Sequence, residues 1–309
     1  MRVLVTGGSG FLGTRLCGAL ERRGDDVTAI HSRSHDLRNP SALDTLTGHF
    51  DLIFHLAAWT QAGDFCLKHP GEQWLVNQQI NTTVLSWWAR DQPDAKLISM
   101  GTSCGYDPNL PLVETNYLAG VPIDGLYTYA MCKRMLHIGQ QALSRQFGLR
   151  YLTLIPSTLY GPGYHTDGRQ MHFIFDLIRK ILRASLGGPR PVLWGNGEQK
   201  RELIHVNDFV ATALHLAAHY ENDLFNVGAG EEFSIRQFAA IICKHVGYPF
   251  EDIEFDSTRY VGAVSKCLDV HKTRSLYGRG MPTSLEAGLA DTIEWFQNNS
   301  AAAALVTAS

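Results

Sequence analysis

The 309-residue chain lacks the features typical of secreted, zinc-binding or nucleic-acid-binding proteins. Its six cysteines show no Cys-x-x-Cys spacing, so neither a metal site nor a disulfide framework is predicted, and we expect reduced thiols. The formal net charge is −3 and no basic run occurs, which argues against nucleic acid as the main partner.

Long hydrophobic runs are also missing. No stretch approaches the ~20 apolar residues of a membrane span, and the first strand-like run is too short for the apolar core of a signal peptide. We therefore expect no membrane partner and a cytoplasmic location. Internal repeats and low-complexity linkers are absent as well, and 309 residues suffice for a large core shared by two lobes.

What is present is an alternation of strand-like and helical segments. Such alternation predicts an α/β fold, a Rossmann-type doubly wound parallel sheet with a smaller C-terminal substrate-binding lobe. The expected strands are 2–6, 26–30, 52–56, 96–100 and 150–155, and the expected helices are 14–23, 72–90 and 127–147.

The domain limits follow from a change in composition. We expect a dinucleotide-binding domain over 1–162, and a loop-rich, basic stretch from Gly163 marks a second lobe over 163–300. Parts of about 202–230 are expected to return to the first domain. The small, apolar tail 301–309 is predicted to be disordered.

Glycines follow the first predicted strand at once. Gly7 permits a tight turn, Gly10 allows a pyrophosphate to approach the backbone at a helix N-terminus, and Gly13 allows close packing of helix on strand. The placement between strand and helix favours a nucleotide site over a plain turn.

Arg33 stands at the end of the second strand, where an NAD enzyme usually carries an acid for the ribose hydroxyls. A guanidinium there suits a 2′-phosphate, so we expect NADP(H) rather than NAD(H). Asp36 and Leu37 follow and are expected near the adenine, although a purely structural loop explains them equally well.

Tyr129 and Lys133 lie four residues apart in a predicted helix, so they share one face. An ammonium that lowers the pKa of a phenol makes a proton-transfer pair, whereas alone the spacing also fits a surface tyrosine on a lysine stem. Thr102, at the end of the fourth strand, adds a hydroxyl that can hydrogen-bond a carbonyl oxygen. The three residues together predict carbonyl reduction.

In this order the motifs resemble those of the extended short-chain dehydrogenase/reductases, the NAD-dependent epimerase/dehydratase branch. The resemblance implies NADP(H) across the sheet edge, a sugar nucleotide in the cleft below the C-terminal lobe, and a homodimer formed through helices 72–90 and 127–147. It rests on Gly7–Gly13, His55–Ala58, Asn77, Thr102–Ser103, Tyr129 with Lys133, Tyr160–Pro162 and Arg201–Asp208, and it implies further cofactor contacts from Phe11, Leu12, Leu56, Ala57, Ala58, Asn77 and Pro156.

Within the branch, Thr102-Ser103-Cys104 resembles the Ser-Ser-Cys of GDP-L-fucose synthases, and His172 has their spacing, ten residues after Pro162. The carboxylates of the dehydratases are missing, which argues against dehydration. The resemblance implies NADPH-dependent C4 reduction of a GDP-4-keto-6-deoxy sugar, hexose or heptose, with epimerisation at C3 and/or C5.

Epimerisation needs a base on one face of the sugar ring and an acid on the other. We expect Cys104 as a thiolate and His172 as an imidazolium in those roles, since both titrate near neutrality. Ser103 completes the expected catalytic set.

The resemblance places cations of the second lobe on the pyrophosphate. Its substrate contacts correspond to Thr158, Lys180, Trp194, Arg201 and Lys266, although Lys180 replaces a family arginine and Thr158 a family asparagine. The loop Trp59–Lys68 is a further departure, so the identity of the sugar stays open.

Two other functions fit the same fold. One is an NAD-dependent UDP-hexose 4-epimerase, against which Arg33 and the pair of Cys104 and His172 argue. The other is a non-catalytic NADP-sensing protein, and such sensors usually lose the Tyr-x3-Lys pair present here.

Overall fold

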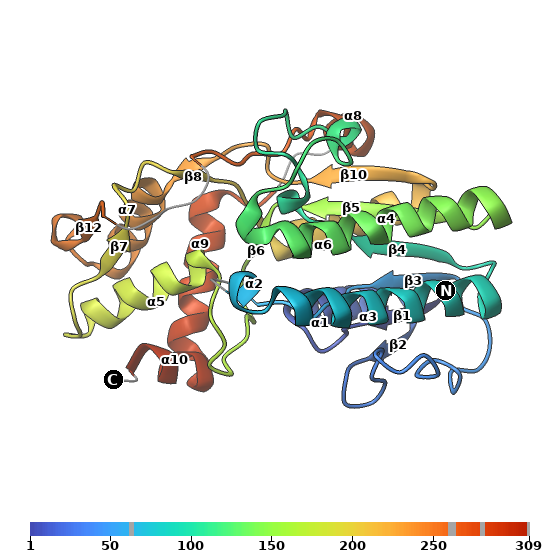
Figure 1. Ribbon diagram of the computed structural model, residues 1–309. Coiled ribbons are helices and arrows are strands. Elements are labelled where there is room, and N and C mark those ends of the chain that lie inside the picture. Colours follow the sequence, from blue (N-terminus) through green and yellow to red (C-terminus); the bar gives the residue numbers. More distant parts are fainter. Residues whose placement is uncertain (62–64, 259–263, 279–281, 308–309) are drawn as a thin grey trace.

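The computed structural model describes residues 1–61, 65–258, 264–278 and 282–307, and it is built around a six-stranded parallel sheet with a smaller lobe at one end (Figure 1). The strand order is β10-β5-β4-β3-β1-β2, the doubly wound arrangement expected from the sequence. These strands are β1 (Arg2–Thr6), β2 (Asp26–Ile30), β3 (Leu52–His55), β4 (Lys96–Met100), β5 (Tyr151–Pro156) and β10 (Asp223–Val227).

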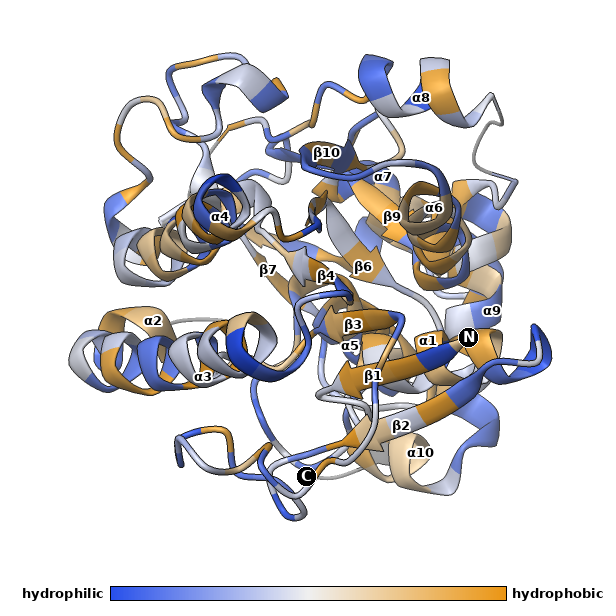
Figure 2. Cartoon of the chain, turned by 90° about the vertical axis from the view of Figure 1, so that its right-hand side faces the viewer, coloured by the Kyte–Doolittle hydropathy of each residue, from blue (hydrophilic) through white to orange (hydrophobic). Residues whose placement is uncertain are grey.

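Buried apolar residues on both faces explain why the sheet is covered on each side. Val3 and Val5 pack with helices α1 and α6, whereas Leu4, between them, packs with α3, because side chains of a strand alternate between faces. Figure 2 shows the sheet between α1–α6 and α3–α4. The helices are α1 (Phe11–Arg22), α2 (Phe65–Lys68), α3 (Pro70–Asp91), α4 (Tyr127–Phe147) and α6 (Val206–His219).

The expected fold class is confirmed, and so are most element limits. Three of the expected strands agree exactly with β1, β2 and β4, and the other two, 52–56 and 150–155, agree with β3 and β5 within one residue at each end. The segment after Arg201 re-enters the first domain, because β10 pairs with β5, in register from Asp223 opposite Leu152. Along the described residues, none of the helices combines the length and apolar character needed to cross a bilayer.

The C-terminal lobe has its own apolar core, in which α5, α7, α9 and α10 meet. Phe175, Phe238 and Phe296 are fully buried there. The lobe comprises α5 (Phe173–Ser185), α7 (Ile235–Val246), α9 (Leu285–Asn298) and α10 (Ser300–Thr307), with the short strands β7 (Val192–Trp194), β8 (Lys200–Arg201), β11 (Phe233–Ser234) and β12 (Glu254–Asp256). The short strands β6 (Thr158–Tyr160) and β9 (Leu203–His205) pair with each other beside α6, and α8 (His271–Tyr277) lies against β10 and α6.

Over residues 301–307 the prediction of a disordered tail was wrong, while residues 308–309 lie outside the described ranges. Residues 300–307 form α10, which packs on α9 and α5. Ala302 is fully buried and Val306 is 4% exposed, because the small side chains let this helix approach the lobe core closely. Alanine also has the highest intrinsic helix propensity.

Gly13 is the tightest point of the glycine turn. Gly7 has φ +69, and a Cβ on Gly13 would collide with the Gly7 carbonyl oxygen and the Gly8 backbone. Only glycine lets α1 start this close to β1.

We expect Gly13→Ala to destabilise the protein by about 1–3 kcal/mol, because the backbone of the turn must move to admit the methyl group. Gly18→Ala, on the same helix, is the matched control, since its Cβ would meet only the Arg22 guanidinium at 3.4 Å. Urea unfolding measures both; equal stability of the two variants would contradict the close-approach argument.

Candidate active site

A cavity of about 570 Å³ lies at the carboxyl ends of β4 and β5, below the C-terminal lobe. Most of the expected catalytic and several expected binding residues line it, although they come from both lobes. They are Phe11, Thr102, Ser103, Cys104, Tyr129, Pro156, Thr158, His172, Arg201 and Lys266.

Arg134 fixes the two catalytic segments relative to each other. Its buried guanidinium, on α4, donates hydrogen bonds to the carbonyls of Gly105 (2.7 Å), Ala119 (2.7 Å) and Gly120 (2.9 Å). The Thr102 amide, at the start of the same loop, donates to the Tyr117 hydroxyl at 3.3 Å. The loop after β4 therefore has one position against the helix that carries Tyr129.

The phenol of Tyr129 is protonated at neutral pH. Burial, followed by the charge of Cys104, raises its pKa well above the usual value. Lys133, whose Nζ lies 5.9 Å from the Tyr129 ring centre, has its own pKa lowered to about 8 by burial. The expected lowering of the phenol pKa by Lys133 is thus not seen; Tyr129 is arranged as a proton donor.

Cys104 contacts a cation from the other lobe. Lys266 Nζ lies 2.9 Å from Cys104 Sγ, and Thr102 Oγ1 accepts a hydrogen bond from the Cys104 amide at 3.3 Å. Burial alone would raise the thiol pKa, but the charge and hydrogen bond of Lys266, with smaller contributions from Thr102 and Arg201, lower it overall. The sulfur is therefore biased toward the thiolate.

His172 does not carry the expected charge. Burial, then the charges of Lys266 and Arg201, lower its pKa to about 4. The imidazole without substrate is therefore neutral at pH 7, rather than the expected imidazolium, because burial and then the two cations disfavour its charged form.

Two expected substrate residues lie outside the cavity lining. Lys180 Nζ pairs with Asp176 on the same helix at 2.9 Å, which follows from their i,i+4 spacing. Trp194, on β7, is 57% exposed. The loop Trp59–Lys68 contributes Thr60, Gln61 and Cys66 to the lining, while its residues 62–64 lie outside the described ranges.

The glycine turn forms a cradle that fits a dinucleotide. A Cβ on Gly7 would lie 2.9 Å from the Ala57 amide nitrogen, so the turn closely approaches the segment Leu56–Ala58, and Gly10 precedes α1 without a capping side chain. The open amides at this helix start suit a pyrophosphate. Leu12 is partly buried beside them.

Other expected cofactor residues have different contacts. The Asn77 amide donates to the Trp59 carbonyl at 2.9 Å and accepts from the Trp59 amide at 3.0 Å, so it positions the segment after Ala58. Asp36 forms a salt bridge with Arg38, and Leu37 is buried. Arg33 is exposed at the end of β2.

Comparison with known proteins places this geometry in a family. The model of the NAD dependent epimerase/dehydratase family matches residues 3–228. The chain belongs to this family. It is 31% identical to a GDP-L-fucose synthase of Escherichia coli (strain K12), over 96% of this chain and 97% of that protein, which confirms the resemblance inferred from the motifs.

The chain also resembles two proteins whose names refer to other sugars. The chain is 26% identical to a GDP-L-colitose synthase of Yersinia pseudotuberculosis, over 96% of this chain and 98% of that protein. The fold also matches a GDP-6-OMe-4-keto-L-xylo-heptose reductase from C. jejuni with a TM-score of 0.85 at 21% identity, covering 96% and 97% of the two chains.

Two buried polar residues in and next to the site were assigned no role from the sequence, although Glu202 stands in the motif Arg201–Asp208. Glu202 is 3% exposed, and its carboxylate accepts hydrogen bonds from the amides of Gly230 (2.6 Å) and Leu268 (2.8 Å). Ser157 lines the cavity, is buried, and its hydroxyl has no hydrogen-bond partner within the described part of the chain. Its neighbour Pro156 was among the expected cofactor contacts, whereas Ser157 was not among the expected site residues.

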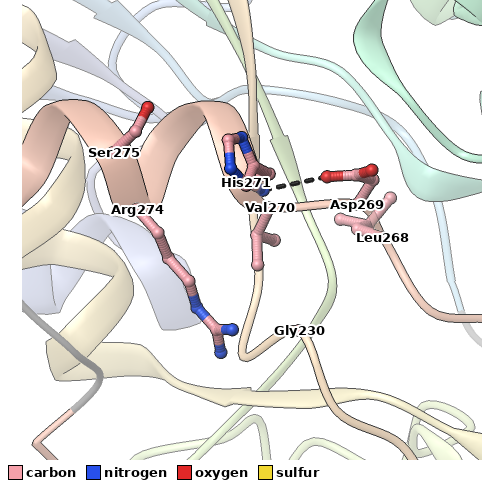
Figure 3. Close-up of a pocket in the computed structure, with 7 residues that line it drawn as sticks. All are labelled: Gly230, Leu268, Asp269, Val270, His271, Arg274 and Ser275. Carbon is pink, nitrogen blue, oxygen red and sulfur yellow. Dashed lines mark hydrogen bonds between the residues drawn. The ribbon is translucent and has the colours of Figure 1, made fainter.

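A second cavity, of about 440 Å³, lies beside the Leu268–Val270 segment (Figure 3). The Arg274 guanidinium extends toward the Gly230 loop and donates to the Ala229 carbonyl. These contacts, with those of Glu202, tie the loop to the segment that also carries Lys266.

We expect Glu202→Gln to flatten part of the pH dependence of stability. Burial raises the Glu202 pKa to about 7, so its stabilising contribution is present below about pH 4.3 and declines as pH rises toward 7, since the folded state then binds the extra proton. The free energy of unfolding of Glu202→Gln should lie below that of the wild type at about pH 5. This difference should shrink by on the order of 2 kcal/mol by about pH 8.

Urea unfolding at both pH values measures this difference. Glu221→Gln, at a side chain that is 47% exposed, is the control and should show no such trend. A constant deficit for Glu202→Gln would show that Glu202 does not titrate in this range.

Proposed function

We propose that the chain reduces the C4 ketone of a GDP-4-keto-6-deoxy sugar, hexose or heptose, with NADPH, and epimerises C3 and/or C5. The carrying observation is that Tyr129, Thr102 and the Cys104–Lys266 contact share one cavity. The names of all three relatives above refer to GDP-linked sugars, which supports this substrate class.

Reduction needs a proton donor at the carbonyl oxygen. Tyr129, kept neutral by its raised pKa, donates the proton to the C4 oxygen, and the Thr102 hydroxyl donates a second hydrogen bond to it. NADPH supplies the hydride when it is bound. Gly7, Gly10 and Gly13 would hold its pyrophosphate.

Epimerisation uses the other half of the cavity. Cys104 Sγ takes the proton next to the C4 carbonyl, an S–H bond forms, and Tyr129 and Thr102 stabilise the enolate oxygen. His172 returns a proton to the opposite face. It gains that proton when an anionic diphosphate offsets the charges of Lys266 and Arg201, the cations that lower its pKa.

A homodimer formed through α3 and α4 is part of the proposal. The two helices pack against each other, and they expose large apolar side chains that a partner copy would cover. These are Trp74 (40%), Leu75 (62%), Tyr127 (44%), Met135 (39%) and Ile138 (39%).

The reaction is tested with GDP-4-keto-6-deoxy-mannose and NADPH in deuterated water, followed by NMR. We expect Tyr129→Phe to slow NADPH oxidation by roughly 10²- to 10⁴-fold, because the proton donor is lost, while deuterium exchange is slowed but not abolished, since Thr102 still binds the enolate oxygen. Cys104→Ser should abolish deuterium incorporation but retain hydride transfer to a ketone that is already epimerised.

Cys267→Ser is the control, since the pKa of this nearby thiol is raised by burial and it lies outside the cavity lining. Deuterium incorporation that survives in Cys104→Ser would remove Cys104 from the mechanism. Deuterium at neither C3 nor C5 in the wild type would reduce the enzyme to a plain reductase.

Arg33 is expected to set the cofactor preference. Its loss should weaken NADPH binding by about 10- to 100-fold, the value of a charge-assisted hydrogen bond, and leave NADH binding unchanged. Titration of Arg33→Gln with both cofactors, followed by fluorescence, measures this. Arg22→Gln, also exposed, is the control, and equal losses for NADPH and NADH in Arg33→Gln would refute the assignment.

A further inference from the structure

We infer that Lys266 is a positioning residue for Cys104: its ammonium forms the ion pair that keeps the sulfur as a thiolate, and Glu232 and Glu202 hold the segment that carries it. The use of the thiolate as a base rests on the proposed function. The ion pair itself does not, because it belongs to the protein without substrate.

The contact joins the two lobes. Cys104 follows β4 in the Rossmann domain, and Lys266 belongs to a C-terminal segment 162 residues later, yet Nζ and Sγ are 2.9 Å apart. Both side chains are part-buried and line the same cavity. A hydrogen bond from an ammonium at this distance is a charge-assisted one.

Several ionisable groups around Cys104 in the described part of the chain are cationic or neutral near pH 7. Arg201 is the second cation, and His172 is neutral. Burial raises the pKa of three further neighbours, so they stay protonated; they are Cys66, Tyr117 and Tyr129.

Two carboxylates fix the backbone on either side of Lys266. Glu232 accepts hydrogen bonds from Ser265 Oγ at 2.8 and 2.9 Å and from the Lys266 amide at 3.2 Å. Glu202 accepts the Leu268 amide at 2.8 Å. Because the backbone is held at residues 265, 266 and 268, the side chain of Lys266 reaches Cys104 from a fixed origin.

The chain itself provides five comparison thiols. The pKa is raised, chiefly by burial, for Cys17, Cys66, Cys132, Cys243 and Cys267. Since the thiolate is the reactive form, an alkylating reagent should distinguish Cys104 from all the others.

The test is the rate of alkylation by iodoacetamide across a pH series, with each cysteine followed by peptide mass spectrometry. In the wild type we expect Cys104 to react first at neutral pH. Lys266→Met should slow its alkylation about tenfold near pH 7 and move the pH midpoint upward. Lys266→Arg, which keeps a cation, should restore most of the rate.

Lys244→Met, an exposed lysine on α7, is the matched control and should behave as the wild type. Glu232→Gln provides a second route, since it keeps Lys266 but loosens its segment, and it should shift the midpoint in the same direction. Circular dichroism establishes that each variant is folded.

An unchanged Cys104 midpoint in folded Lys266→Met and Glu232→Gln would overturn the inference, as would equal loss in Lys266→Met and Lys266→Arg. No sugar nucleotide is present in this assay. If Cys104 alkylation depends on Lys266 but the protein reduces no 4-keto sugar, the ion pair stands and the proposed function is rejected. If the protein reduces the sugar but Cys104 alkylation does not depend on Lys266, the proposed function stands and the ion pair is rejected.

Discussion

The site depends on one buried cation, Arg134. Its guanidinium is 4% exposed, and a charge removed from water is tolerated only when its donors are satisfied. Three backbone carbonyls satisfy them, two from residues 119–120 and one from Gly105. Because Arg134 follows Lys133 directly on α4, the same turn of helix that presents the Tyr129–Lys133 face also locks the loop bearing Thr102 and Cys104.

Charge in the cavity is divided between the lobes. The Rossmann side contributes the phenol of Tyr129 and the thiol of Cys104, whereas Arg201 and Lys266 on the C-terminal side contribute positive charge. Neither lobe alone contains a complete site. Burial is the main cause of the low pKa of His172, and the same two cations lower it further; at Cys104 those cations outweigh burial and lower the thiol pKa.

The sequence was most informative where the signal is local. The glycine turn, the strands and the span of α4 depend on spacing within a few residues, and they were predicted closely. The contact of Lys266 with Cys104 and the hydrogen bonds of Glu202 join residues far apart in the chain, and no pattern along a single sequence encodes them. The prediction for the tail failed for another reason: four consecutive alanines carry little amphipathic pattern, so the sequence did not reveal the burial of Ala302.

The docking of α10 has a consequence for how the chain is made. The core that α5 and α7 share with α9 is completed by Ala302 and Val306, which are synthesised after the other members of that core. The parallel sheet is complete in sequence once β10 has emerged at Val227, and N-terminal units generally fold first during synthesis. The apolar faces of the second lobe therefore stay uncovered after the sheet is complete and until α10 is made, and chaperone binding should concentrate there.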